Sequence, residues 1–237
     1  MSLISAHAAG VAAMIAAPAF FWAAYHYYKD RHAPEPGAFL LLSFALGIAG
    51  AWLGSQAYQA LDLFGLRKDP FLLAREDLTG LLFYAIFAIG VIEETVKFLP
   101  FWFIGIRHHH FDEPIDGIIY ASFVALGFAA YENVYYLSWM GTWEALGRSI
   151  ASPLVHVMFA SIWGYACSRA QCAGRPVLPA GLAALALAAV IHGIYDFLVI
   201  GFPAWAGIGA PLSIGLVWAW RLHLVGVLTR HHTAGRR

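Results

Sequence analysis

The sequence predicts an all-α membrane protein, a polytopic bundle of about seven transmembrane helices. Hydrophobic residues make up 61% of the 237 residues and charged residues 12%, whereas soluble proteins are roughly half apolar and about a quarter charged. The mean hydropathy is +0.67. This composition excludes a disordered tail, a coiled coil and an ordinary soluble domain.

The apolar runs can be assigned to spans one by one, because a transmembrane helix needs about 20 apolar residues. Seven spans and their loops use nearly the whole chain, so we expect a single integral membrane domain over residues 1–237, with the function inside the bundle and a motif-bearing core at about 81–200. The expected spans are residues 9–28, 38–57, 81–106, 116–139, 149–169, 177–200 and 203–225.

Residues 57–80 lie between the second and third expected spans and mix leucine and phenylalanine with charged residues. Such a mixture is typical of an amphipathic segment that lies at the membrane interface. We therefore expect a short interfacial segment here, and it could gate access to a site within the bundle.

The basic residues predict the orientation of the chain in the bilayer. No Lys or Arg precedes the first span, whereas Lys29 and Arg31 follow it, which favours an uncleaved helix with its N-terminus outside. Most other basic loop residues then fall on the cytoplasmic side, although residues 57–80 place three on the outer side and Arg148 is expected in an outer loop. We expect the N-terminus outside and the C-terminus in the cytoplasm.

Charge balance and cysteine content exclude other classes of site. Lys and Arg number 14, as do Asp and Glu, so no basic field indicates a nucleic-acid partner. Two cysteines provide neither a disulfide framework nor a four-cysteine zinc site. The lipid bilayer is the one partner that composition itself predicts.

Ionisable residues within the spans are the strongest functional signal. A charged side chain at the bilayer centre costs roughly 2.5–3.5 kcal/mol, so these groups must face inward, pair with one another or meet water. They come from four separate spans, which predicts one shared polar site. The residues are Glu93, Glu94, Lys97, Glu132, His156, His192 and Asp196.

Helical spacing supports convergence within each span. Glu93 and Glu94 lie four and three residues before Lys97, and His192 lies four before Asp196, so each set shares a helix face. Small residues continue these faces at intervals of four, which allows close helix packing in lipid. These stripes are Ala184 and Ala188 before His192, Ala121, Ala125 and Ala129 before Asn133, and Ala160 and Gly164 after His156.

This set of side chains suits hydrolysis. A glutamate can deprotonate water, and histidines can orient the water, stabilise an oxyanion or bind zinc. The sequence contains neither an HExxH zinc-protease helix nor a GxSxG nucleophile. Two other classes stay open, because intramembrane carboxylates and histidines also form proton relays in transporters or channels, and a non-catalytic scaffold could retain them.

At this point the residues resemble the PrsW family of intramembrane proteases. Glu93-Glu94-Thr95-Val96-Lys97 resembles its EExxK motif, and the segment from Asp116 to Asn133, with Glu132, resembles its second motif. PLVHVMFASIWGYA with His156 and IHGIYDF with His192 and Asp196 resemble the third and fourth. The four motifs run in family order over about residues 90–198.

The resemblance implies roles for these residues. PrsW proteins are related to CAAX prenyl proteases, whose pattern is EExxxR, a histidine and HxxxN. By that likeness Glu93, tuned by Glu94 and Lys97, would activate water with His156, while His192 and the residue four later would stabilise the oxyanion. Asp196 replaces the asparagine. Because an ionised aspartate cannot donate a hydrogen bond, Asp196 would be protonated, orient His192 or help to bind a metal. Asp116, Glu132 and Asn133 would support the site.

The resemblance also implies a substrate and leaves the cofactor open. The family cleaves single-pass membrane proteins, typically anti-sigma factors, near the outer face of the bacterial cytoplasmic membrane. Counting residues from the span ends also places the site in the outer half of the membrane. One zinc ion could be held by His156, His192 and one carboxylate from Glu93, Glu94 or Asp196; the alternative is a metal-free glutamic mechanism.

Overall fold

The computed structural model describes residues 3–29, 34–104, 111, 113–138 and 140–204, with positions 215, 219 and 223. All regular structure within these residues is helical, which confirms the predicted all-α class. The elements are α1 (Leu3–Lys29), α2 (Gly37–Leu63), α3 (Pro70–Glu76), α4 (Leu78–Tyr84), the π-helix η1 (Ala85–Gly90), α5 (Val91–Ile104), α6 (Pro114–Tyr136), α7 (Thr142–Cys172) and α8 (Val177–Gly201).

Six helical segments of the described chain are long and apolar enough to cross a membrane, and they correspond to the first six predicted spans. The third begins at Leu78 rather than residue 81, and α7 begins at Thr142 rather than 149, so Arg148 belongs to a helix and not to a loop. Nearly all of the predicted seventh span, 203–225, lies outside the described residues. The six segments are Ala8–Tyr28, Gly37–Leu63, Leu78–Phe103, Pro114–Tyr136, Thr142–Cys172 and Val177–Gly201.

The amphipathic segment is shorter than the predicted 57–80, because α2 continues to Leu63 and α4 begins at Leu78. The chain turns at Gly65, whose φ of +65° is a conformation that glycine adopts without strain. The Asp69 carboxylate then accepts a hydrogen bond from the Phe71 amide (2.8 Å) and caps α3. Exposed apolar side chains alternate here with charged ones, as an interfacial segment requires. They include Leu63, Phe64, Leu66, Phe71 and Leu72.

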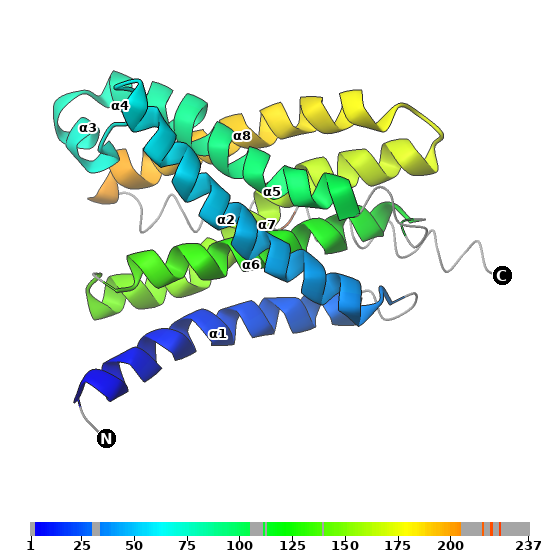
Figure 1. Ribbon diagram of the computed structural model, residues 1–237, viewed down its shortest axis with the longest axis horizontal. Helices are drawn as coiled ribbons and strands as arrows, with labels where there is room; N and C mark the ends of the chain where they lie inside the picture. The colour runs from blue at the N-terminus through cyan, green and yellow to red at the C-terminus, as the bar shows by residue number, and fades with distance from the viewer. Residues whose placement is uncertain are drawn as a thin grey trace.

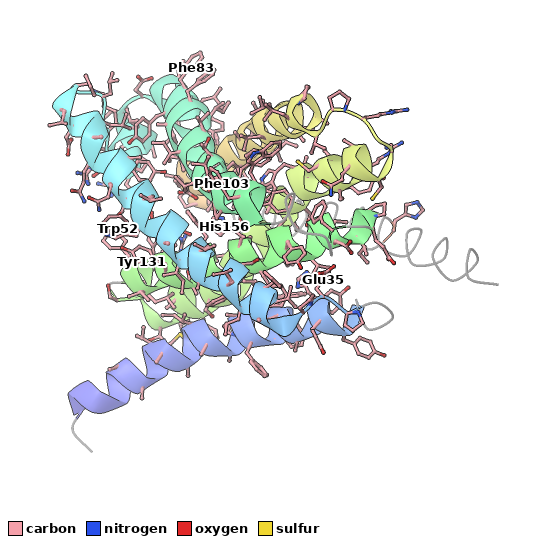
Figure 2. The ribbon with its side chains drawn as sticks, turned by 45° about the vertical axis from the view of Figure 1, so that its right-hand side comes forward. Glu35, Trp52, Phe83, Phe103, Tyr131 and His156 are labelled. Atoms are coloured by element: carbon pink, nitrogen blue, oxygen red, sulfur yellow. The ribbon has the colours of Figure 1, made fainter. Side chains whose placement is uncertain are left out.

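Helix α6 forms the centre of the bundle (Figure 1). Every residue from Ile115 to Ala129 is buried, and α6 contacts α1, α2, α5 and α7. Apolar side chains on the outer helices, such as Trp52, Phe83 and Phe103, are more than half exposed and point away from the bundle (Figure 2). This arrangement, with an enclosed central helix and an apolar outer surface, is suited to lipid surroundings.

Glycine pairs bring the helix backbones into contact at two crossings. A Cβ on Gly127 of α6 would lie 1.9 Å from the Phe44 carbonyl oxygen of α2, and one on Gly47 would lie 2.0 Å from the Val124 oxygen. Gly117 of α6 and Gly164 of α7 approach each other in the same way, at 2.1 and 2.3 Å. Larger side chains would separate these helices, so the glycines fix how α2 and α7 sit on α6.

The small-residue stripes predicted from the sequence lie at packed interfaces. All of their members are buried: Ala121, Ala125, Ala129, Ala160, Gly164, Ala184 and Ala188. The helix faces that continue into Asn133, His156 and His192 are therefore packing faces, as expected.

Candidate active site

The π-helix η1 ends three residues before Glu93, the first of the two adjacent glutamates. Each π-type turn carries an extra residue, which rotates the following side chains around the helix axis. Gly90 in this segment lies against α8, where a Cβ would approach the Ala189 carbonyl oxygen to 2.1 Å, and Gly193 of α8 packs in return on Ile86. The close contact brings the start of α5 next to the part of α8 that carries His192.

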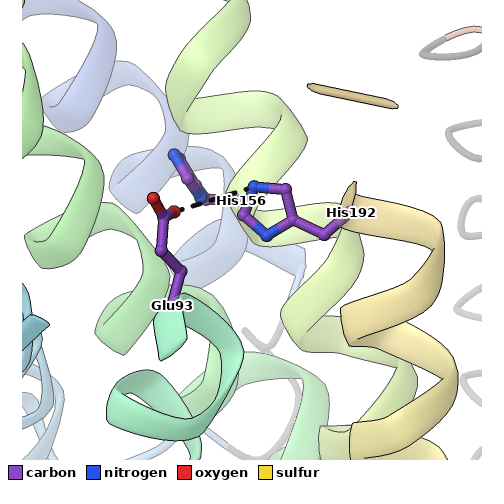
Figure 3. Close-up of side chains that lie close together, drawn as sticks. All are labelled: Glu93, His156 and His192. Carbon is purple, nitrogen blue, oxygen red and sulfur yellow. Dashed lines mark ion pairs between the residues drawn. The ribbon is translucent and has the colours of Figure 1, made fainter. Parts of the chain in front are cut away.

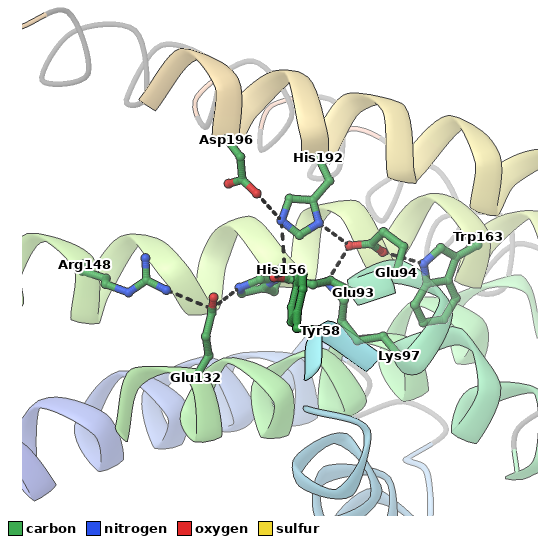
Figure 4. Close-up of polar contacts among 10 residues, drawn as sticks. All are labelled: Tyr58, Glu93, Glu94, Lys97, Glu132, Arg148, His156, Trp163, His192 and Asp196. Atoms are coloured by element: carbon green, nitrogen blue, oxygen red, sulfur yellow. Dashed lines mark hydrogen bonds and ion pairs between the residues drawn. The ribbon is translucent and has the colours of Figure 1, made fainter. Parts of the chain in front are cut away.

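The bundle brings the predicted polar residues into one connected network (Figure 4). It draws on α5, α6, α7 and α8, the four spans that carry them, and on α2. The innermost groups are buried, whereas the side chains of Glu132, Asp196 and Arg148 are 18%, 21% and 24% exposed. These three residues form the mouth of the site.

Glu94 is fully occupied by contacts with other site residues. Its Oε1 accepts hydrogen bonds from Lys97 Nζ (2.5 Å) and His192 Nδ1 (2.8 Å), and its Oε2 accepts one from Trp163 Nε1 (2.9 Å). The side chains of Glu94 and Lys97 have no exposed surface. Glu94 therefore holds its neighbours in place, and both of its oxygens are hydrogen-bonded and shielded from solvent.

Glu93 has a different environment from Glu94. Its Oε1 accepts a hydrogen bond from the Tyr58 hydroxyl (3.1 Å). Its Oε2 is buried without a hydrogen-bond partner among the described residues and lies 3.7 Å from His192 Nε2. Buried polar atoms in proteins are nearly always paired, so this oxygen is the one prepared to meet a water, a substrate or an ion.

His156 is fixed at both ring nitrogens. Its Nδ1 lies 3.0 Å from Lys97 Nζ, and its Nε2 lies 2.9 Å from Glu132 Oε2. Because an ammonium group only donates hydrogen bonds, Nδ1 accepts and Nε2 donates its proton to Glu132. Arg148 binds the same Glu132 oxygen at 3.0 Å and stacks over the Tyr136 ring at 3.8 Å.

Both ring nitrogens of His192 face carboxylates. Its Nδ1 donates to Glu94, which leaves Nε2 facing Glu93 Oε2 at 3.7 Å and Asp196 Oδ2 at 3.5 Å. A neutral ring in this tautomer would direct a lone pair at two carboxylates. A positively charged occupant at Nε2, either a proton or a metal ion, removes that repulsion.

Three residues are spaced to hold a metal ion: Glu93, His156 and His192 each offer a ligand atom within 4.8 Å of the others (Figure 3). Both histidines also contact a second carboxylate, Glu94 or Glu132, as zinc-binding histidines commonly do. With all carboxylates ionised and the histidines neutral, the network carries two more negative than positive charges, which suits a divalent cation. For His156 Nδ1 to bind the cation, Lys97 would have to give up its contact with that nitrogen.

Two predicted supporting residues do not join this network. Asp116 lies in the first turn of α6, where its carboxylate accepts a hydrogen bond from the Glu113 amide (2.6 Å). It is 16 residues from Glu132, about 24 Å along the helix, so its contact is with the helix start and not with the site. Asn133 is buried, but its Oδ1 has no hydrogen-bond partner in the described structure.

Three members of the network, Tyr58, Arg148 and Trp163, were not predicted from the sequence. Signals for two of them were present. Gly50 and Gly54 precede Tyr58 at intervals of four, the same pattern that leads to His192. Arg148 lies eight residues before His156 and therefore on the same face of α7.

Comparisons with known proteins identify the family of the chain. A family model described as PrsW family intramembrane metalloprotease matches residues 35–224. Protease PrsW of Geobacillus kaustophilus is 31% identical over 219 residues, covering 92% of this chain and 88% of that protein. Protease PrsW of Bacillus subtilis is 29% identical over 204 residues, covering 85% and 88%. No solved structure shows significant similarity. The chain belongs to the PrsW family of intramembrane proteases.

Proposed function

We propose that this chain is an endopeptidase that hydrolyses single-pass membrane proteins, such as anti-sigma factors, within the outer half of the bilayer. The observation that carries the proposal is Glu93 Oε2, a buried and unpaired carboxylate oxygen beside His156 and His192. Peptide hydrolysis needs a base for water within hydrogen-bond reach. Glu93 offers that atom, whereas Glu94 does not.

The proposed reaction uses these groups in order. The oxygen of a water molecule attacks the scissile carbonyl carbon, and its proton passes to Glu93 Oε2. The carbon–nitrogen bond then breaks, and the leaving amine takes the proton from Glu93. Glu94 and Glu132 keep the two histidine rings oriented throughout, since each accepts a hydrogen bond from one of them.

A divalent cation, with zinc the expected metal, would be held by Glu93, His156 and His192. The family description and the negative balance of the network both support it. When bound, it would supply Lewis-acid polarisation and a hydroxide at neutral pH. Glu93 would then be one of the ligands, and Asp196, the remaining carboxylate beside His192, could hold a proton.

The proposed depth rests on where the mouth residues lie in their helices. Glu132 precedes the end of α6 by four residues and Asp196 the end of α8 by five, so both lie within about 8 Å of those ends. With the N-terminus outside, as the basic residues predict, both ends face outward. A substrate cut there would be cleaved close to the outer surface.

The test compares the termini of membrane proteins, by mass spectrometry, in cells that carry the wild type or Glu93→Gln. We expect a single-pass protein to accumulate uncut in the variant, because the amide cannot accept the proton of water. Glu76→Gln, in the exposed helix α3, is the matched control and keeps cleavage. Full cleavage by a folded Glu93→Gln protein would refute the assignment. The alternative of proton-coupled transport predicts unchanged termini and proton-coupled uptake into liposomes.

A further inference from the structure

Hydrolysis of a peptide bond needs a hydrogen-bond donor as well as a base. When water adds to the carbonyl carbon, negative charge develops on the carbonyl oxygen, and a positioned donor stabilises it. Asp196, when ionised, only accepts hydrogen bonds. The donor at this site must therefore be another group.

Most donors in the network have an acceptor among the described residues. The buried Arg148 Nε has none, but Arg148 lies beyond Glu132, on the far side of His156 from Glu93 (Figure 4). Lys97 and Trp163 both donate to Glu94, Arg148 donates to Glu132, and His192 Nδ1 donates to Glu94. His156 Nε2 donates to Glu132. Diverting any of these would break the contacts that hold the histidines in place.

Tyr58 differs from these donors, because its hydroxyl donates to Glu93, the carboxylate that carries the unpaired oxygen, and not to one that orients a histidine. The hydroxyl lies 3.1 Å from Glu93 Oε1, and the neighbouring Oε2 is the unpaired oxygen. Tyr58 comes from α2, opposite α8, and its ring reaches the network between Glu93 and the mouth (Figure 4).

The helix that carries Tyr58 is held rigidly against the site. A Cβ on Gly50 would lie 2.6 Å from the Val96 carbonyl oxygen of α5, and Gly54, four residues before Tyr58, also packs on Val96. Val96 is three residues from Glu93, so this contact fixes α2 against the part of α5 that carries the glutamates. A rigid donor of this kind costs little reorganisation when charge develops beside it.

We propose that Tyr58 is a catalytic residue whose hydroxyl donates a hydrogen bond to the substrate carbonyl oxygen as it becomes an oxyanion. The hydroxyl then turns to the new negative charge, and it returns to Glu93 when the amine leaves with the proton. Tyr58 keeps its own proton throughout. This inference rests on the proposed peptidase function.

The variant Tyr58→Phe removes the hydroxyl and keeps the ring, and Tyr135→Phe, on an exposed tyrosine of α6, is the matched control. Purified proteins in liposomes are assayed with a single-pass substrate that the wild type cleaves. We expect kcat to fall roughly 100-fold in Tyr58→Phe, the usual effect of removing one oxyanion donor, with KM nearly unchanged. Tyr135→Phe should match the wild type in both constants.

A second measurement distinguishes hydrogen-bond donation to the oxyanion from a role in which Tyr58 only positions Glu93. A phosphinate isostere of the cleaved peptide carries a charged tetrahedral oxygen, like the intermediate, so Tyr58→Phe should bind it roughly 100-fold more weakly. Its affinity for the uncleaved peptide should stay the same. Equal loss of affinity for both ligands, or wild-type kcat in Tyr58→Phe, would overturn the inference. A wild type without cleavage would instead refute the proposed function, and this inference with it.

Discussion

The site contains two ion pairs, each of which positions a histidine, and the two pairs differ in their exposure to solvent. At its inner end Lys97 pairs with Glu94, and Glu94 holds His192; at its mouth Arg148 pairs with Glu132, and Glu132 holds His156. Both side chains of the inner pair are fully buried, whereas those of the outer pair are 24% and 18% exposed. The two histidines are therefore oriented by carboxylates of unequal accessibility.

The difference in exposure indicates that the inner ion pair stabilises the bundle, whereas the outer ion pair positions groups for the reaction. An ion pair without contact to water is costly to form, but it is far more costly to leave half of it unpaired. The Lys97 ammonium also contacts the Phe128 ring (4.7 Å) and His156, so it joins α5, α6 and α7. We expect the inner pair to control folding and the outer pair to control activity.

The largest effect is expected from Lys97→Met, which leaves the Glu94 carboxylate buried without its cation. We expect a loss of about 3–5 kcal/mol in the free energy of unfolding, measured by thermal or denaturant unfolding in detergent. Lys68→Met, at an exposed lysine before α3, is the control and should leave stability unchanged. If Lys97→Met were as stable as the control, the inner pair would have no structural role.

A second variant tests the same ion pair if the single variant fails to fold. The double variant Lys97→Met with Glu94→Gln removes both charges together. It should recover part of the lost stability, because no unpaired charge remains. A double variant less stable than Lys97→Met alone would contradict this account.

The next effect concerns metal binding between the two pairs. We expect about one equivalent of zinc per purified chain, since two histidines and a carboxylate form a common zinc ligand set, and its loss in His156→Ala. Cys172→Ala removes an exposed thiol and should keep the metal, which separates site binding from adventitious binding. Elemental analysis after dialysis provides the measurement. A metal-free protein that cleaves in the presence of chelator would assign the reaction to Glu93 acting directly on water.

The charged residues within the expected spans were predictable from the sequence, both at the inner end of the site and at its mouth. Glu93, Glu94, Lys97, His192 and Asp196 could be placed together because each charge in an apolar span demands a partner, and intervals of three or four residues set their faces. Asp116 lies apart from the network because the motif that contains it is longer than the site: the first turn of α6 is about 24 Å from Glu132.

Arg148 and Tyr58 were missed for different physical reasons. Arg148 lies near an expected span end, where an arginine normally reaches water, and only the seven additional residues at the start of α7 place it inside a helix opposite Glu132. Tyr58 is uncharged and so incurs no burial penalty that would mark it. Its position depends on how α2 crosses α6 and α5, which the glycines allow but the sequence spacing does not specify.

The smallest of these effects is expected from Arg148→Gln at the mouth, and it should appear in activity more than in stability. Partly exposed ion pairs contribute about 1 kcal/mol or less to folding. Without Arg148, however, Glu132 is free to move, and His156 loses the contact that fixes its ring. Changes in such supporting contacts typically cost 10–100-fold in activity or metal affinity.

The control for this variant is Arg169→Gln on the same helix, because Arg169 is exposed and also faces a tyrosine ring (5.9 Å). We expect Arg148→Gln to reduce kcat about 10–100-fold and the unfolding temperature by a few degrees at most, with Arg148→Lys restoring part of the activity. If Arg148→Gln instead unfolded the protein as Lys97→Met does, the two ion pairs would be equivalent. A separate role for the mouth would then be lost, because the contact of Glu132 with His156 would matter only through folding.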